Sequence, residues 1–213
     1  TPSNTGWLSP TANAAVTSSA GDNNGFEVNP TYAYTDDGLF AVDNNSGTGM
    51  STSCTSTQKD KHRYYNYNIS LPGGATVAGI EVRLDAKVDA TSNSPKMCVQ
   101  LSWDGGTTWT ATKSTPTLTT SEATYILGGA ADTWGRTWTV GNLSNTRLRG
   151  RSINVASSSA RGRCSNRPWR RIPAWPRRAS FWAPPAFARV SSTARASSTL
   201  RRWSSGPITG RRT

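Results

Sequence analysis

Residues 76–90, TVAGIEVRLDAKVDA, decide the fold class of this chain. Apolar and charged side chains alternate along most of this stretch. A period of two residues places successive side chains on opposite faces of a β-strand, whereas a helix requires a period near 3.6. The stretch therefore predicts a half-buried strand whose apolar face carries Ile80, Val82, Leu84, Ala86 and Val88.

Alternation of the same kind recurs on both sides of this strand. We predict further strands in RYYNYNISL (63–71), KMCVQLSW (96–103) and DTWGRTWTV (132–140), and short edge strands within residues 1–59. Turn signals such as LPGGA (71–75) separate the strands, and no long helical period lies between them. We therefore expect an all-β protein, folded as an antiparallel β-sandwich of the jelly-roll type.

Charge divides the chain into two parts. Residues 1–150 hold all twelve acidic residues and ten basic ones, whereas residues 151–213 hold fourteen Arg and no Lys, Asp or Glu. Beyond residue 155 the sequence shows no period and is rich in Arg, Ser, Ala, Pro and Trp. We therefore expect a sandwich domain over residues 1–155 and an irregular, basic, low-complexity tail over residues 156–213.

Two explanations of the tail stay open. A real basic tail of this composition is disordered, because it has too few apolar residues to form a core. The alternative is a frameshift that replaced the closing strands, since Arg without Lys or acidic residues is typical of a GC-rich gene read in the wrong frame. The alternation in TRLRGRSINV (146–155) is lost between Gly150 and Ser152, which favours the second explanation.

The three cysteines also leave two alternatives. Cys54 and Cys98 lie in the acidic part and predict one disulfide, with Cys164 as the odd cysteine. The alternative is three free thiols. The chain contains no apolar run long enough for a transmembrane helix and no basic leader with an apolar stretch, so we expect no membrane span.

The stretch SWDGGTTW (102–109) fits the pattern S-x-D-x-G-x-T-W at every fixed position. In such a turn the Asp accepts backbone hydrogen bonds, the glycines supply positive φ, and the Trp is expected to fold back as an apolar plug. The stretch resembles the Asp-box, a hairpin motif repeated in sialidases and found singly in other secreted β proteins. The resemblance implies a structural role for Ser102, Asp104, Gly106, Thr108 and Trp109.

A wider resemblance covers residues 1–155. The stretches GWLSPTANAA (6–15), DDGLFA (36–41), LPGGATVAGIEVRLDAK (71–87) and VQLSWDGGTTWT (99–110) resemble a β-sandwich module of bacterial secreted, cell-surface and phage-tail proteins. Such modules are typically non-catalytic. The resemblance implies an extracellular location, secreted or at the cell surface, and a role in glycan binding, adhesion or structural packing.

The inventory of titratable residues argues against an enzyme. A single Asp-box does not build a propeller, and a glycosidase requires two juxtaposed carboxylates, whereas the chain has only Glu27, Glu81 and Glu122 besides its aspartates. His62 is the only histidine and lies between two basic residues, so we expect it to be exposed and incidental. We therefore expect no catalytic residue.

Aromatic side chains are the candidates for sugar binding, because a flat ring stacks on the C–H face of a pyranose. Core packing is the alternative, and it is favoured for the two tryptophans at 103 and 138, which are in phase with apolar neighbours. Tyr64 and Trp134 are expected to be the better exposed. The candidate ligand-binding residues are Tyr64, Tyr67, Trp134, Trp138 and Trp103.

Calcium is the only cofactor that the sequence suggests. Asp36, Asp37, Asp43 and Asn44 cluster around a glycine-containing loop, and hard oxygen ligands in irregular loops suit Ca²⁺. The alternative is that these residues only form turns, as Asp and Asn commonly do.

We therefore predict a non-catalytic extracellular module that binds polysaccharide or a cell-surface glycan, or serves as an accessory or adhesion domain. The alternative is a structural subunit that self-associates in an extracellular filament or a phage tail. A nucleic-acid partner is not expected, because no DNA- or RNA-binding motif accompanies the basic tail.

Overall fold

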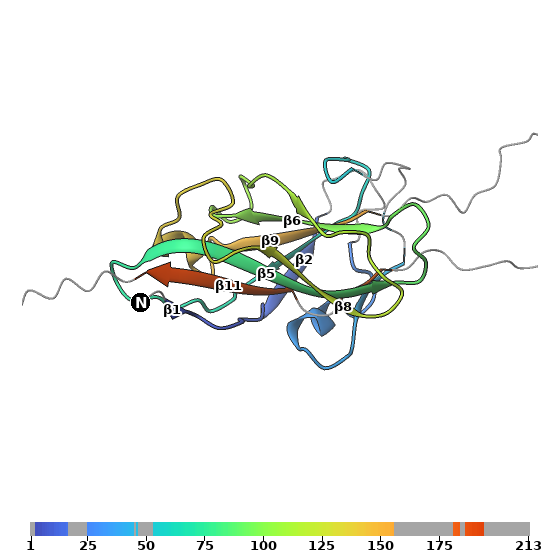
Figure 1. Ribbon diagram of the computed structural model, residues 1–213, viewed down its shortest axis with the longest axis horizontal. Coiled ribbons are helices and arrows are strands. Elements are labelled where there is room, and N and C mark those ends of the chain that lie inside the picture. Colours follow the sequence, from blue (N-terminus) through green and yellow to red (C-terminus); the bar gives the residue numbers. More distant parts are fainter. Residues whose placement is uncertain are drawn as a thin grey trace, which may run out of the picture.

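The computed structural model describes residues 3–16, 25–44, 46, 53–155, 181–183 and 186–193. Within these ranges the chain forms antiparallel strands and two short 3-10 helices, and it contains no α-helix. The all-β prediction is therefore confirmed, and the strands form two sheets (Figure 1). The 3-10 helices are η1 (Pro30–Tyr34) and η2 (Val140–Leu143).

The long strand β5 (Thr76–Val88) organises the first sheet. Its apolar face is buried throughout, as the alternation in residues 76–90 predicts. β8 pairs with one edge of β5, and β11 and β10 pair with the other. The six strands of this sheet are β1 (Ser3–Asn4), β11 (Ala186–Thr193), β5, β10 (Phe181–Ala183), β3 (Ala41–Asp43) and β8 (Ala123–Gly128).

The second sheet has five antiparallel strands. β9 lies at its centre and pairs along its whole length with β6, without a break between Gly150 and Ser152. Glycine is required at position 150, because a Cβ there would lie 2.8 Å from the hydroxyl of Tyr67. The order of the strands is β2 (Ala12–Ala15), β4 (Lys61–Tyr65), β9 (Arg149–Val155), β6 (Lys96–Ser102) and β7 (Lys113–Ser114).

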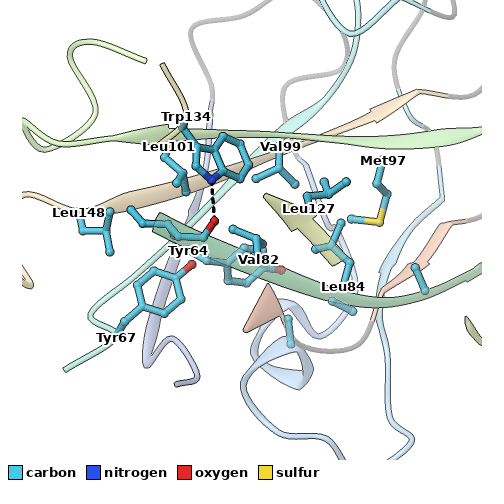
Figure 2. Close-up of a cluster of buried hydrophobic side chains, with 14 of the residues drawn as sticks. Tyr64, Tyr67, Val82, Leu84, Met97, Val99, Leu101, Leu127, Trp134 and Leu148 are labelled. Atoms are coloured by element: carbon cyan, nitrogen blue, oxygen red, sulfur yellow. Dashed lines mark hydrogen bonds between the residues drawn. The ribbon is translucent and has the colours of Figure 1, made fainter. Parts of the chain in front are cut away.

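The main hydrophobic cluster takes side chains from both sheets (Figure 2). Val82 and Leu84 of β5 and Leu127 of β8 come from the first sheet, and Met97, Val99 and Leu101 of β6 come from the second. Burial of apolar surface between two such faces is the dominant favourable contribution to folding. The finer prediction, a jelly-roll sandwich, is not decided by this pairing and stays a prediction.

Residues 132–140 do not form the predicted strand. Trp134 and Gly135 adopt positive φ angles of 54° and 76°, which end extended backbone. The segment instead folds over β5, where Ile80 N–H donates to the carbonyl of Asp132 (3.0 Å). The alternation of tryptophans there reflects a loop whose rings pack inward, and not a pleated strand.

The Arg-rich segment, for which the sequence predicts an irregular tail, contributes β10 and β11 to the first sheet. β11 pairs with β5 from Ala186 opposite Leu84 to Thr193 opposite Thr76. Strands on this edge satisfy backbone groups of β5 that an open edge would leave unpaired. The rest of the segment, with Cys164, lies outside the described residues, and the predicted boundary at residue 155 stays a prediction. None of the helices in the described part of the chain is long and apolar enough to cross a membrane.

Candidate anion-binding site

The outer face of the five-stranded sheet has two halves of different character. In one half Cys98, Ile153 and Val155 form a small buried cluster, and Cys54 packs against them. The segment that carries Cys54 is held there by the Cys54–Cys98 disulfide, which the sequence predicts. The other half is polar and only partly buried, and it carries Arg63, Tyr65, Arg149, Arg151 and Gln100.

Strand pairing brings these polar residues together. Arg63 of β4 lies opposite Arg151 of β9, and Arg151 lies opposite Gln100 of β6. Tyr65 lies opposite Arg149, two residues along the same strands. Positions two apart on a strand share a face, and directly opposed residues have Cβ atoms about 5 Å apart. Three guanidinium groups are therefore concentrated on one patch, which we call the arginine cluster (Arg63, Arg149 and Arg151).

Two aromatic rings hold the arginine cluster in place. The guanidinium carbon of Arg149 lies 4.1 Å from the centroid of the Tyr65 ring, and that of Arg151 lies 4.0 Å from the Trp109 ring. A cation over an aromatic face is attracted by the negative centre of the ring. The rings of Tyr65 and Trp109 therefore help to fix the orientation of the guanidinium groups of Arg149 and Arg151.

The turn Ser102–Trp109 borders the cluster. Asp104 accepts hydrogen bonds from the backbone N–H groups of Thr107 (3.1 Å) and Thr108 (2.9 Å), and the Ser102 hydroxyl donates to Asp104 (2.8 Å). The hydrogen bonds from Thr108, with those from Ser102 and Thr107, lower the pKa of Asp104 to about 2. The side chains of Ser102 and Asp104 are therefore both used within the turn itself.

Trp109 folds back against Gly106 of the turn, and its ring also contacts the arginine cluster. Its ring is half-buried, its indole N–H donates to the carbonyl of Gly106 (3.0 Å), and its face is covered by Arg151. The ring therefore connects the turn to the arginine cluster.

Gly106 is the point where the turn meets the cluster. Its φ of 101° favours glycine. A Cβ at this position would lie 3.3 Å from Nη1 of Arg63, 3.5 Å from the ring of Trp109 and 3.9 Å from Cγ of Arg149. Glycine thus allows the backbone to approach the arginines closely, and the turn forms one wall of the site.

Among the residues that the structure describes, no carboxylate forms an ion pair with the arginine cluster. The ion pairs among the described residues join Arg83 to Asp36 and Asp85, and Lys113 to Asp132, and none involves the cluster. Burial and the nearby Arg63 lower the pKa of Arg151 to about 10. Burial also lowers the pKa of Arg149, with Arg63 as a further cause.

Hydrogen bonding of the cluster is also incomplete. Arg149 donates to the carbonyl of Asn145 (2.7 Å), and Arg151 donates to the side-chain oxygen of Gln100. The Nε–H groups of Arg63 and Arg151 are buried, and no acceptor among the described residues bonds them. Buried donors normally have a partner. The described residues therefore leave part of the donor capacity of these arginines unused.

The aromatic residues predicted to bind sugar lie mainly in the core. Tyr64 is 2% exposed and Trp134 is 4% exposed, so the expectation that these two rings are exposed is wrong. Tyr67 and Trp138 are buried as well. Trp103 is half-buried, and its ring is covered by the guanidinium of Arg136 at 3.9 Å. Figure 2 shows Tyr64, Tyr67 and Trp134 directed into the cluster of apolar side chains between the sheets.

The residues suggested for calcium are dispersed. Asp36 pairs with Arg83, and Asp37 caps the N–H of Leu39. Asp43 is fully buried and accepts a hydrogen bond from Asn154 (2.6 Å), whereas Asn44 is exposed. In the described part of the chain no group of three or more His, Cys, Asp or Glu could hold a metal ion. The structure therefore does not bring the four predicted residues together as one site.

His62 is buried, contrary to the expectation that it is exposed, with 3% of its surface accessible. Its Nδ1 accepts from the backbone N–H of Phe26 (3.2 Å), so Nε2 carries the proton and donates to Asn13 Oδ1 (2.8 Å). Both ring nitrogens are thus used by the neutral form. Burial, with a smaller contribution from Arg63, lowers the pKa of His62 to about 4.

We expect this histidine to make stability depend on pH. An unfolded histidine titrates near pH 6.5, so between pH 6.5 and about 4 the unfolded chain binds more protons than the folded one. The free energy of unfolding therefore falls as the pH drops through this window, by about 3 kcal/mol in total. Urea unfolding at pH 7 and pH 4 should show a smaller decrease for His62→Gln than for the wild type. An equal decrease in both proteins would contradict this assignment.

Sequence reasoning missed the arginine cluster as a site. Arg149 and Arg151 alternate along TRLRGRSINV, and that period was available as a signal. The pairing of this strand with β4, which carries Arg63 much earlier in the chain, could not be predicted from the sequence. Comparison of the chain with protein-family models, with curated proteins and with solved structures finds no match.

Proposed function

We propose that the two sheets form a β-sandwich module of an extracellular protein, and that this module binds polysaccharide without catalysing a reaction. The binding surface is the polar half of the outer face of the five-stranded sheet, on β4, β9 and β6. The turn Ser102–Trp109 serves as an Asp-box that locks two strands and supplies one wall of this surface.

One observation carries the proposal: two partly exposed rings lie against a cluster of arginines at the outer face of one sheet. Tyr65 and Trp109 flank the arginine cluster, and the side-chain oxygen of Gln100 accepts a hydrogen bond from Arg151. Sugar-binding sites combine aromatic surface with a few placed polar groups, because a sugar ring presents both C–H faces and hydroxyls. A rigid sheet holds such groups in fixed positions, which lowers the entropic cost of binding.

This surface differs from the five aromatic side chains that the sequence suggested as the sugar-binding residues. Four of those five side chains are buried and pack between the sheets, so they support the fold that carries the site.

A binding experiment with a matched variant tests the proposal. Affinity electrophoresis of the full chain through gels with soluble neutral and acidic polysaccharides should show retardation by at least one of them. Tyr65→Ala should weaken that retardation about fivefold or more, because it removes a ring worth about 1 kcal/mol and releases Arg149. Tyr125→Ala, which removes a half-buried ring from β8 of the other sheet, is the control and should leave binding unchanged.

Size-exclusion chromatography of the same samples tests the alternative. A structural subunit of a filament or phage tail would elute as a high-mass species and would be retarded by no polysaccharide. That pair of results would contradict the proposed function.

A further inference from the structure

We infer that the arginine cluster is a subsite for an anionic oxygen group, and that the polysaccharide bound is therefore an acidic one. The group is a carboxylate, as in a uronic acid, or a sulfate ester. This inference rests on the proposed function and names the ligand class of the same surface.

The geometry of the guanidinium groups favours an oxyanion over a hydroxyl. Arg63 and Arg151 are directly opposed across two paired strands, and Arg149 follows two residues along β9. Each guanidinium is a planar fork of N–H donors that matches the paired oxygens of a carboxylate or sulfate. Three such forks on one patch provide more donors than a single sugar hydroxyl accepts.

The charge of the patch points to the same ligand. Three arginines lie together, partly buried, and no described carboxylate forms an ion pair with any of them. Like charges at this separation repel one another, and partial burial weakens the screening by water and salt. A neutral sugar leaves that repulsion in place, whereas an anion removes it. The cluster is thus complementary to negative charge, and no carboxylate of the described residues forms an ion pair with it.

Asp104 does not supply the missing negative charge. Its carboxylate accepts hydrogen bonds from Ser102, Thr107 and Thr108, all within its own turn. The turn also passes close to the cluster at Gly106, where an added Cβ would lie 3.3 Å from Nη1 of Arg63. The turn therefore shapes the site and leaves its charge to an external group.

A site-specific effect must be distinguished from general attraction to the basic chain. The thirteen arginines of residues 152–213 attract any polyanion, and that attraction is present in every variant of the full chain. Arg147 provides a matched control because its side chain is exposed and lies outside the cluster. Its backbone carbonyl accepts from Gly105 (2.8 Å), a contact that a side-chain substitution preserves.

The experiment compares three full-length proteins, wild type, Arg151→Gln and Arg147→Gln, by calorimetric titration at physiological salt. The probes are polygalacturonate, dextran sulfate, unmodified dextran and an oligothymidylate. We expect Arg151→Gln to lower affinity for polygalacturonate, dextran sulfate or both about tenfold, the usual effect of losing a charge-assisted hydrogen bond. Arg147→Gln, with the same change in net charge, should change affinity less than twofold. Thermal unfolding confirms that each variant is folded.

Each other outcome overturns the inference. Equal affinity for dextran and for the acidic polymers would contradict the anionic subsite and would leave the proposed polysaccharide binding standing. If the folded protein bound none of the polysaccharides, both the anionic subsite and the proposed function would be contradicted. Equal losses in Arg151→Gln and Arg147→Gln would assign binding to net charge alone, and a tenfold loss of oligothymidylate binding in Arg151→Gln would assign the cluster to nucleic acid. A selective loss with only one of the two acidic polymers identifies carboxylate or sulfate as the group bound.

Discussion

Removing the disulfide by the double substitution Cys54→Ala and Cys98→Ala is expected to lower the free energy of unfolding by about 4 kcal/mol. The two cysteines are 44 positions apart, so the bond restricts a long loop in the unfolded chain. A loop of that length corresponds to about 4 kcal/mol of lost chain entropy. Chemical denaturation monitored by tryptophan fluorescence measures the difference.

The structure adds a local consequence to this global one. Cys98 lies in β6, and Cys54 lies on the segment that covers Ile153 and Val155. Amide hydrogen exchange along β9 should therefore increase at Ile153 and Val155 in the double variant. Wild-type protein treated with a reducing agent is the control, and it should match the variant in both measurements. If the free energy of unfolding fell by less than about 1 kcal/mol in both the double variant and the reduced wild type, the segment would be held by other contacts.

The framework of the fold was accessible from the sequence because alternation is a local property. β5 and β6 were both predicted, and each has a clean alternation with an apolar face that is buried in the structure. Side chains on such a strand have only two directions, so the pattern reports burial directly. No knowledge of the partner strand is needed for that step.

The loops were less accessible, because the same alternation has more than one cause. DTWGRTWTV alternates large and small residues, yet its backbone turns at Trp134 and Gly135. The deciding information is the positive φ at Trp134, an uncommon conformation for a non-glycine residue that tertiary packing holds in place. Similarly, β4 ends at Tyr65 where Asn66 and Asn68 adopt positive φ, within a stretch that continues to alternate.

Only one part of the candidate site could be predicted from the sequence. The turn Ser102–Trp109 could be read from its own residues, because its hydrogen bonds are made within the turn. The arginine cluster could not, because it depends on which strands are neighbours. Arg63 and Arg151 are paired only because β9 enters between β4 and β6, and a non-local pairing of this kind is not written in either segment.

The reading of aromatic residues failed for a related reason. Tyr64 and Tyr65 are adjacent in the sequence, and the sequence favoured the first for exposure. The structure buries Tyr64 between the sheets and leaves Tyr65 partly exposed beside Arg149. Successive side chains of a strand lie on opposite faces, so assigning the wrong face to β4 exchanges a core residue with a surface residue.

Trp134 provides the second large effect, because it separates a core role from the ligand-binding role that the sequence suggested. Its indole N–H donates to the carbonyl of Ile80 in β5 (2.9 Å), the bond drawn in Figure 2, and its ring belongs to the main hydrophobic cluster. Trp134→Ala is expected to lower the free energy of unfolding by about 4 kcal/mol, since it removes a large buried ring and leaves a cavity. Urea denaturation followed by circular dichroism measures this loss.

The matched variant Trp134→Phe keeps most of the apolar volume and removes the hydrogen bond. The Ile80 carbonyl still accepts from the N–H of Gly129 (3.3 Å), so we expect a loss of only about 1–2 kcal/mol. Polysaccharide binding by the folded fraction should be unchanged in both variants, because this ring lies between the sheets and the arginine cluster lies on the outer face. A Trp134→Ala protein of wild-type stability that no longer binds polysaccharide would return the ring to the ligand site and displace the arginine cluster from that role.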